Sequence, residues 1–282
     1  MRFGQIILVA LLILGAITSA ASAGAMPLTP QRQALRFAAN NSLFVLYHEV
    51  AHLLFDQLNI PILGREEDAA DNLATWTLLN QPDGKSEQAL DDAAYGWILT
   101  GLAYNSGSTE SDFYAAHSLD RQRAYQIVCL MVGNNEKRFH KIADGYGMDI
   151  VRQISCADDY RRISRSLKGV FASRTMKNPD ATKVTVNYQA VSGSLRQAAD
   201  AFRNSGVFDR VADELRRNYH LRHKVLFTAK RCDGDANSYY DADTVEIIYC
   251  YELMDDFISL FVNDVPDGMT APGQSRRNGR AN

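Results

Sequence analysis

The sequence predicts an α+β protein that is rich in helix, with a small sheet contributed mainly by the second half of the chain. Two patterns support this class. Apolar residues recur at helical spacing through most of the first 176 residues, and they alternate at period two after residue 183. The stretch 177–180 (Lys-Asn-Pro-Asp) favours a turn and marks the boundary between the two patterns. We expect regions 24–176 and 177–265 to pack together as one domain.

Each helix predicted in the first half has apolar residues three and four positions apart. Ser42 is a residue type that caps helix N-termini, so the first helix is expected to begin there. It is expected to end before Pro61, because proline cannot continue a helix. The predicted helices are Ser42–Leu58, Ala69–Leu79, Leu90–Ala103 and Phe113–Val132, followed by short helical pieces between Lys137 and Cys156. A turn is expected at 81–84.

The second half alternates strands with amphipathic helices. The predicted elements are strands at Val184–Tyr188, Val225–Phe227 and Thr244–Tyr251, helices at Leu195–Tyr219 and Glu252–Phe261, and a turn at 233–237. The tail 266–282 contains Pro, Gly, Ser and Arg without apolar periodicity, so we expect it to be disordered.

The N-terminus has the features of a secretory signal peptide. Arg2 precedes an apolar segment from Ile6 to Ile17, and Ala21-Ser22-Ala23 is a small-residue cleavage site. The apolar segment is short for a membrane span, so we expect cleavage after residue 23, with an uncleaved anchor as the alternative. These features predict a periplasmic or secreted protein without a stable membrane span after cleavage.

Composition excludes some partners. The formal net charge of the 282-residue chain is −3, and loss of Arg2 with the signal segment makes it one unit more negative. Such a mildly acidic chain offers no electrostatic basis for binding nucleic acid. The hydrophobic content of 46% is ordinary for a globular protein.

Four cysteines are consistent with export, because an even number in an exported protein suggests disulfides. Three pairings are possible. We favour Cys129–Cys156 and Cys232–Cys250, since each closes a short loop, and we expect the second pair to join the strands of a hairpin. The spacings do not match a zinc ribbon.

The stretch 47–52 contains H-E-x-x-H inside an apolar, helical run. His48 and His52 are four residues apart, so on a helix both imidazoles point to the same side, where they can bind one metal ion. Glu49 is adjacent and can act as a general base. This arrangement is typical of zinc metallopeptidases, although a buried helix with a hydrogen-bonded histidine pair is the structural alternative.

A zinc site requires a third protein ligand. Metzincins supply it through a Gly and a further His on the same segment, but those positions hold Phe55 and Leu58, so this class is excluded. The block Leu63-Gly64-Arg65-Glu66-Glu67-Asp68-Ala69-Ala70-Asp71 resembles the thermolysin-like (Glu-zincin) pattern. The resemblance implies that Glu67 is the third ligand and that Asp71 orients a ligand histidine, which by position is His48. Glu66 and Asp68 remain alternatives for the ligand.

Several blocks together resemble an uncharacterised bacterial family of metallopeptidases. They are H-E-x-x-H, N-I-P-I-L-G-R-E-E-D-A-A-D, N-S-Y-Y-D and C-Y-E-L-M, spread from about residue 40 to about residue 262. The resemblance implies a zincin-like fold and a metal centre more than it implies a substrate.

Three further residues are weaker candidates. His117 could donate a hydrogen bond to the oxyanion of a tetrahedral intermediate, or it could simply lie on the surface. Asn237 and Tyr239 lie in a segment that resembles the sheet edge bordering the cleft of neutral zinc metallopeptidases, where extended peptide can pair. A purely structural hairpin is equally compatible with that segment.

These observations predict a zinc-dependent metallopeptidase that uses metal-activated water on a peptide or protein substrate. An inactive zincin-fold binding or scaffold protein and a zinc amidase acting on a non-peptide amide are the alternatives. The oligomeric state is left open.

Overall fold

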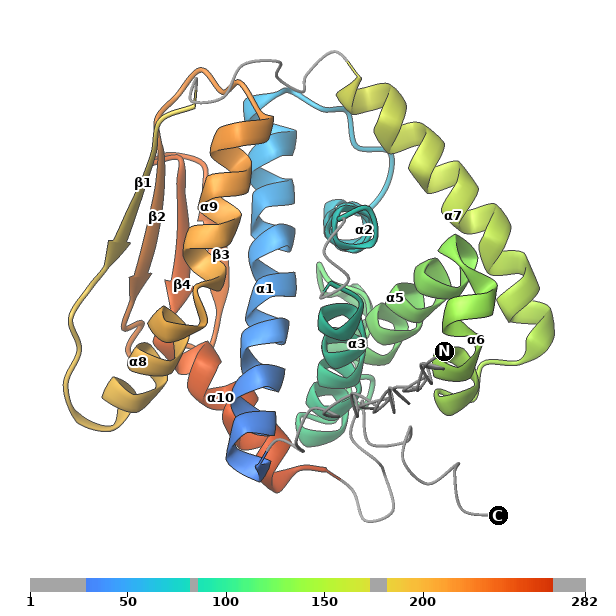
Figure 1. Ribbon diagram of the computed structural model, residues 1–282, viewed down its shortest axis with the longest axis horizontal. Helices are drawn as coiled ribbons and strands as arrows, with labels where there is room; N and C mark the ends of the chain where they lie inside the picture. Colours follow the sequence, from blue (N-terminus) through green and yellow to red (C-terminus); the bar gives the residue numbers. More distant parts are fainter. Residues whose placement is uncertain (1–28, 82–85, 173–181, 266–282) are drawn as a thin grey trace, which may run out of the picture.

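The computed structural model describes residues 29–81, 86–172 and 182–265 (Figure 1). Within these residues, ten α-helices and one four-stranded sheet form the helix-rich α+β fold that the sequence predicts. The predicted signal peptide 1–23, the boundary at 177–180, the tail 266–282 and most of the turn at 81–84 lie outside the described residues.

Helix α1 (Pro30–Gln57) runs through the middle of the molecule (Figure 1). Its cap is Thr29, whose side chain accepts the backbone N–H of Arg32, and a proline occupies the first turn, where no N–H is needed. The helix ends where Asn59 adopts a positive φ of 48° shortly before Pro61.

The predicted start at Ser42 is wrong by more than three turns. Ser42 is buried inside α1, and its hydroxyl lies 2.8 Å from the carbonyl oxygen of Ala38 and 2.6 Å from the hydroxyl of Tyr249. Because both contacts satisfy the serine within the helix, it does not interrupt the helix.

A layer of helices packs on one side of α1. Helix α2 is seen nearly end-on in Figure 1, so it crosses α1 steeply. Helices α2 and α3 contact α1 directly. Helix α5 packs on α2 and α3, and α7 packs on α5. The layer consists of α2 (Glu66–Leu79), α3 (Ser86–Ala103), α5 (Asp120–Asn134), α6 (Glu136–Gly145) and α7 (Ile150–Phe171).

The single helix predicted over Phe113–Val132 is wrong. The chain forms a short helix, α4 (Glu110–Tyr114), and then leaves helical structure until α5 begins. The two helices start separately, because Asp112 accepts the backbone N–H of Thr109 at 2.9 Å and Gln122 accepts that of Leu119 at 3.1 Å. His117 therefore lies in the connection between them and not on a helix face.

The sheet lies on the other side of α1, with strand order β1-β2-β4-β3. Its strands are β1 (Val184–Tyr188), β2 (Val225–Lys230), β3 (Ser238–Asp241) and β4 (Glu246–Cys250). The first three strands of that order are parallel to one another, and β3 is an antiparallel edge strand beside β4. Strands β3 and β4 both contact α1.

Both favoured disulfides are present. Cys129 of α5 is bonded to Cys156 of α7, and Cys232 is bonded to Cys250. We expected the second bond to join the strands of a hairpin, and this is wrong. The bond links the end of β4 to the residues after β2, and these two strands are parallel. The hairpin is β3–β4 instead.

The predicted helix Leu195–Tyr219 is divided at Gly206, which adopts a φ of 69° that favours glycine. This gives α8 (Arg196–Ser205) and α9 (Val207–Asn218). Helix α10 (Tyr251–Asn263) follows β4 directly.

One hydrophobic core extends from α1 through the sheet to α10. In it, the ring of Phe202 stacks on that of Tyr249 at 3.8 Å. Helix α1 is thus held between the sheet and the helical layer, which fixes the side chains it presents at the α1–α2 junction. None of the helices in the described ranges combines the length and apolar character needed to cross a membrane.

Candidate metal centre

Three side chains converge where α2 crosses α1. His48 and His52 lie one turn apart on α1, and Glu67 lies in the first turn of α2. The two Nε2 atoms are 3.0 Å apart, and Glu67 Oε2 lies 3.0 Å from His48 Nε2 and 3.3 Å from His52 Nε2. Among the described residues, these three form the group whose ligand atoms are close enough to share a metal ion.

The outer nitrogen of each histidine is bound to a carboxylate. His48 Nδ1 lies 2.8 Å from Asp71 Oδ1, and His52 Nδ1 lies 2.8 Å from Glu66 Oε1. Because a carboxylate accepts hydrogen bonds, both Nδ1 atoms donate, and in the neutral imidazoles both Nε2 atoms present lone pairs. Two lone pairs and a carboxylate oxygen then face one another, an arrangement that requires a proton or a cation between them.

The donor set fits zinc. Two imidazole nitrogens and one carboxylate oxygen are a common ligand set of catalytic zinc, and ligands about 2 Å from a tetrahedral ion lie about 3.3 Å apart. The three separations of 3.0, 3.0 and 3.3 Å are close to that value. The side chains of His52 and Glu67 are partly exposed, so solvent reaches this cluster.

Local sequence explains this geometry. The histidines share a face because they are four residues apart on a helix. Gly64 has a φ of 139°, which allows the chain to turn sharply before α2. Helix α2 then begins with Glu66, Glu67 and Asp68, and carboxylates are favoured at the positive end of a helix.

Asp71, the carboxylate that binds His48, belongs to a buried ion pair. Arg123 of α5 donates two hydrogen bonds to Asp71, from Nε to Oδ2 at 2.8 Å and from Nη2 to Oδ1 at 2.9 Å. Its guanidinium also lies 3.6 Å from the ring centroid of Trp97 on α3. Burial opposes ionisation of Asp71, but the charge and hydrogen bonds of Arg123 outweigh it and hold the pKa of Asp71 below its usual value.

The charges at the centre are strongly coupled. Burial lowers the pKa of His48, but its hydrogen bonds with Asp71 and Glu67 outweigh burial and raise the pKa to about 9. For Glu67, burial likewise opposes the net change, while hydrogen bonds from His117, His48 and His52 hold its pKa well below the ordinary value. The cluster of His48, His52 and Glu67 therefore favours a positive charge between its ligand atoms.

Glu49 is buried beside the two histidines. Burial raises its pKa to about 7, although the charges on His48 and His52 act in the opposite direction. The backbone N–H of Tyr240, on the edge strand β3, donates a hydrogen bond to its carboxylate. A carboxyl group with a pKa near neutral is well suited to accept and return a proton.

His117 reaches the centre from the connection between α4 and α5. Its Nε2 lies 2.8 Å from Glu67 Oε2, and its ring stacks on that of His48 with centroids 5.8 Å apart. Two further contacts position this connection: Ser118 donates to Asp68 at 2.7 Å, and Arg65 donates to the carbonyl of His117 at 3.5 Å. Almost half of the His117 side chain remains exposed, which leaves it accessible to a substrate.

The structure brings together His48, Glu49, His52, Glu67, Asp71 and His117. The alternative ligands have other partners, since Glu66 binds the outer nitrogen of His52 and Asp68 accepts from Ser118. Tyr239 is exposed on β3, and Asn237 is exposed directly before it; the carbonyl of Asn237 accepts the backbone N–H of Cys250.

Sequence reasoning missed several contacts of the site. The partnership of Glu66 with His52, the Arg123–Trp97 stack and the Tyr240 hydrogen bond to Glu49 were not predicted. Nothing in the sequence indicated that Arg123 pairs with Asp71. These residues come from separate elements, so no spacing along the chain relates them.

Comparison with known proteins adds one finding. The model of the DUF4344 family, described as "Putative metallopeptidase", matches residues 16–170 and 188–277, which is well over half of the chain. No curated protein and no solved structure matches the chain.

Proposed function

Because the chain belongs to the DUF4344 metallopeptidase family, we propose that it is a zinc-dependent peptidase of the Glu-zincin type that hydrolyses peptide bonds with activated water. The observation that supports this most directly is the convergence of His48, His52 and Glu67, with the outer nitrogen of each histidine tied to a carboxylate.

In this proposal, His48, His52 and Glu67 hold the ion. Zinc bound there supplies a Lewis acid that lowers the pKa of water toward about 7 and polarises the scissile carbonyl. Asp71 keeps His48 in the tautomer whose Nε2 faces the ion, and Glu66 does the same for His52.

Glu49 is the general base. It takes a proton from the attacking water and delivers it to the leaving amine, a transfer that typically contributes 10²–10⁴-fold to the rate. Burial and the Tyr240 hydrogen bond hold its carboxylate in place beside the ligands.

His117 is the candidate oxyanion donor. Its contact with Glu67 and its partly exposed ring support this role. A hydrogen bond to the developing oxyanion would stabilise the transition state more than the ground state.

Strand β3 is the candidate substrate edge. It lies at the end of the sheet and contacts α1, and its Tyr240 N–H already reaches Glu49. An extended peptide aligned beside β3 would bring a peptide bond close to the general base, with Tyr239 among the exposed side chains it could contact.

The two disulfides indicate an oxidising compartment. Together with the predicted signal peptide, they support a periplasmic or secreted peptidase.

Zinc content and peptide hydrolysis, measured on the same preparations, test the proposal. We expect the wild type to contain about one zinc per chain and to cleave members of a broad peptide library. Glu49→Gln should keep its zinc and lose about 10²–10⁴-fold in rate, because only the proton acceptor is removed. His48→Ala and Glu67→Ala should lose zinc. Glu110→Gln, an exposed glutamate on α4, is the matched control and should change neither quantity.

Two outcomes would contradict parts of the proposal. Full zinc in Glu67→Ala would move the third ligand to Glu66 or Asp68. Equal zinc and equal cleavage in the wild type and Glu49→Gln would remove the peptidase assignment.

A further inference from the structure

Helix α7 presents an exposed hydrophobic group at its N-terminal end. Ile150, Val151 and Ile154 are 61%, 74% and 68% exposed. Single exposed aliphatic residues are ordinary, but three within five positions on one helix face form a patch.

The same face continues as a basic surface toward the C-terminal end of α7. Arg161, Arg165 and Lys168 follow Ile150 and Ile154 at helical spacing and are exposed, and Arg162 is exposed beside them. We call these seven residues the α7 stripe: Ile150, Val151, Ile154, Arg161, Arg162, Arg165 and Lys168. The acidic side chain on this face, Asp158, is paired with Arg161.

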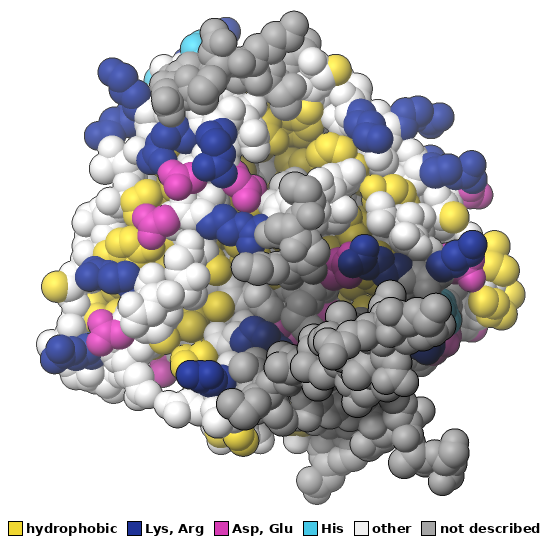
Figure 2. Space-filling view, viewed as in Figure 1, with side chains coloured by type: hydrophobic (Ala, Val, Ile, Leu, Met, Phe, Trp, Pro, Cys, Tyr) yellow, Lys and Arg dark blue, Asp and Glu magenta, His cyan; other side chains and the backbone are white. Residues whose placement is uncertain are grey.

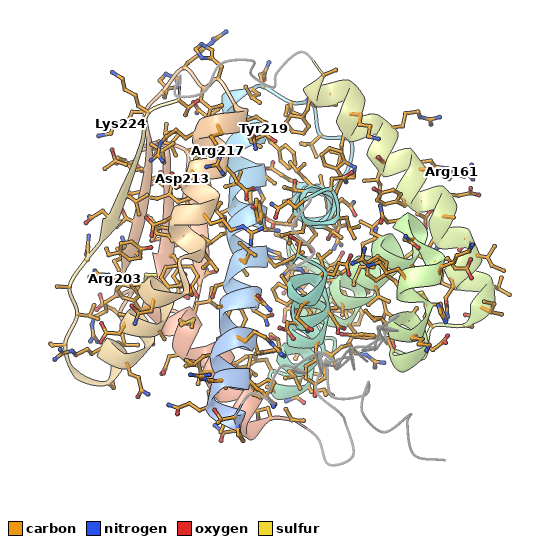
Figure 3. All side chains as sticks on the ribbon, viewed as in Figure 1. Arg161, Arg203, Asp213, Arg217, Tyr219 and Lys224 are labelled. Carbon is orange, nitrogen blue, oxygen red and sulfur yellow. A yellow bond between two sulfur atoms is a disulfide. The ribbon has the colours of Figure 1, made fainter. Side chains whose placement is uncertain are left out.

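The opposite face of α7 is fixed in the protein. Cys156 is disulfide-bonded to α5, Ser164 accepts a hydrogen bond from the indole of Trp76, and Phe171 is buried. The α7 stripe therefore points outward permanently and does not depend on a rotation of the helix. Figure 2 shows hydrophobic and basic side chains along the rim that α7 occupies in Figure 1, and Arg161 projects from this rim in Figure 3.

We propose that the α7 stripe docks the protein on an anionic phospholipid surface. The aliphatic group enters the headgroup region while the four basic side chains contact lipid phosphates, the two interactions that hold amphipathic helices at membrane surfaces. Charge complementarity favours this partner: the four basic side chains of the α7 stripe match lipid phosphates. The chain as a whole has a net charge of −3, so this basic stripe is a local feature of its surface. A bilayer also offers phosphate and an apolar phase side by side along the 22 residues of α7.

Vesicle sedimentation tests the proposal on the full exported chain, with the N-terminus of every variant verified by mass. The wild type should bind vesicles of 70% phosphatidylcholine and 30% phosphatidylglycerol at least tenfold more tightly than pure phosphatidylcholine vesicles, and salt should weaken the binding. Arg162→Gln/Arg165→Gln/Lys168→Gln and Ile150→Ser/Val151→Ser/Ile154→Ser should each weaken it at least tenfold. The control Arg196→Gln/Arg222→Gln/Lys224→Gln removes the same charge elsewhere and should bind like the wild type. Lys224 lies on the opposite side of the molecule from Arg161 in Figure 3.

Thermal unfolding of each variant shows whether it is folded, and both stripe variants change exposed side chains only. Equal binding to neutral and anionic vesicles, or unchanged binding by the basic variant, would overturn the proposal. So would self-association of the wild type that the serine variant abolishes, because the α7 stripe would then be an interface between copies of the chain. Peptidase activity does not enter these measurements, so they stand apart from the proposed function.

Discussion

The two histidines of the candidate metal centre lie one turn apart on the same helix, yet their outer nitrogens face two different environments. His48 binds Asp71, which is buried and clamped by Arg123. His52 binds Glu66, whose side chain is 53% exposed and, within the described ranges, forms no ion pair with an arginine or lysine. We call Asp71 with Arg123 the buried wall of the centre, and Glu66 the exposed wall.

This difference bears on how each ligand is held. At the buried wall, two hydrogen bonds and a stack on Trp97 fix the carboxylate, so His48 has little freedom to rotate. At the exposed wall, water can replace the carboxylate at low cost. If a metal ion binds as proposed, His48 would be the more rigidly held ligand and His52 the ligand that can adjust.

The largest expected effect is that of Asp71→Asn. This change removes the counter-charge of Arg123, and an unpaired buried charge costs about 3–5 kcal/mol. It also weakens the bond that orients His48, which should reduce zinc affinity about 10–100-fold. Urea unfolding and chelator competition measure the two effects. Asp213→Asn, which alters a surface pair with Arg216 and is labelled in Figure 3, is the control and should change both by little. An unchanged free energy of unfolding for Asp71→Asn would show that the ion pair with Arg123 does not stabilise the buried wall.

The next effect is a pH dependence of the metal-free protein. The pKa of His48 is raised from 6.5 to about 9, so between these values the folded state binds more protons than the unfolded chain. Stability from this group is therefore complete below pH 6.5 and is lost as the pH rises through about 9, by up to about 3 kcal/mol. The raised pKa of Glu49, about 7, acts in the same direction between 4.5 and 7.

Urea unfolding at pH 6 and pH 9.5, with chelator and with zinc, measures this dependence. Zinc binds the neutral imidazole, so the decline should disappear when zinc is present. Equal stability of the chelated protein at the two pH values would argue against the charge coupling of the buried wall.

A smaller effect is expected for Arg123→Lys. Lysine keeps the positive charge next to Asp71 but loses the paired hydrogen bonds and the stack on Trp97, so we expect a loss of about 1–2 kcal/mol. Zinc affinity should fall less than tenfold, because the counter-charge remains. Arg161→Lys, at an exposed pair with Asp158, is the control and should change the free energy of unfolding by less than about 0.5 kcal/mol. A loss as large as that of Asp71→Asn would mean that geometry, and not charge, stabilises the buried wall.

The members of this centre differ in how far the sequence could predict them. The spacing of His48 and His52 specifies a shared face because helix geometry is local. Glu67 and Asp71 are also four residues apart and share a face of α2, from which both contact His48. The separate role of Glu66 could not be predicted, because the choice among three consecutive carboxylates depends on how α2 is rotated against α1.

Long-range features of the fold were predicted less well. Three of the four strands were predicted from local sequence, but the parallel pairing of β2 with β4 joins segments that no local pattern relates. The edge position of β3 was indicated only by the resemblance of its segment to a sheet edge. Ser42 was expected to start a helix because serine often caps helix N-termini. Its contact with Tyr249, which is 207 positions away in the sequence, could not be inferred from local sequence. His117 was expected on a helix, but α4 ends where Ala115 becomes extended, and a new helix starts only after Leu119, whose N–H is accepted by Gln122.

The smallest effect, and the sharpest test of the two walls, is that of Glu66→Gln. The glutamine oxygen can still accept the hydrogen bond of His52 Nδ1, and the lost charge is at a half-exposed position where water screens it. We therefore expect zinc affinity to fall by about two- to fivefold, below the usual range for a ligand's carboxylate partner. The free energy of unfolding should change by less than about 0.5 kcal/mol. Chelator competition beside Asp71→Asn gives the comparison directly: if the two isosteric changes reduce zinc affinity equally, both histidines are held with the same rigidity, and His52 is not the ligand that adjusts.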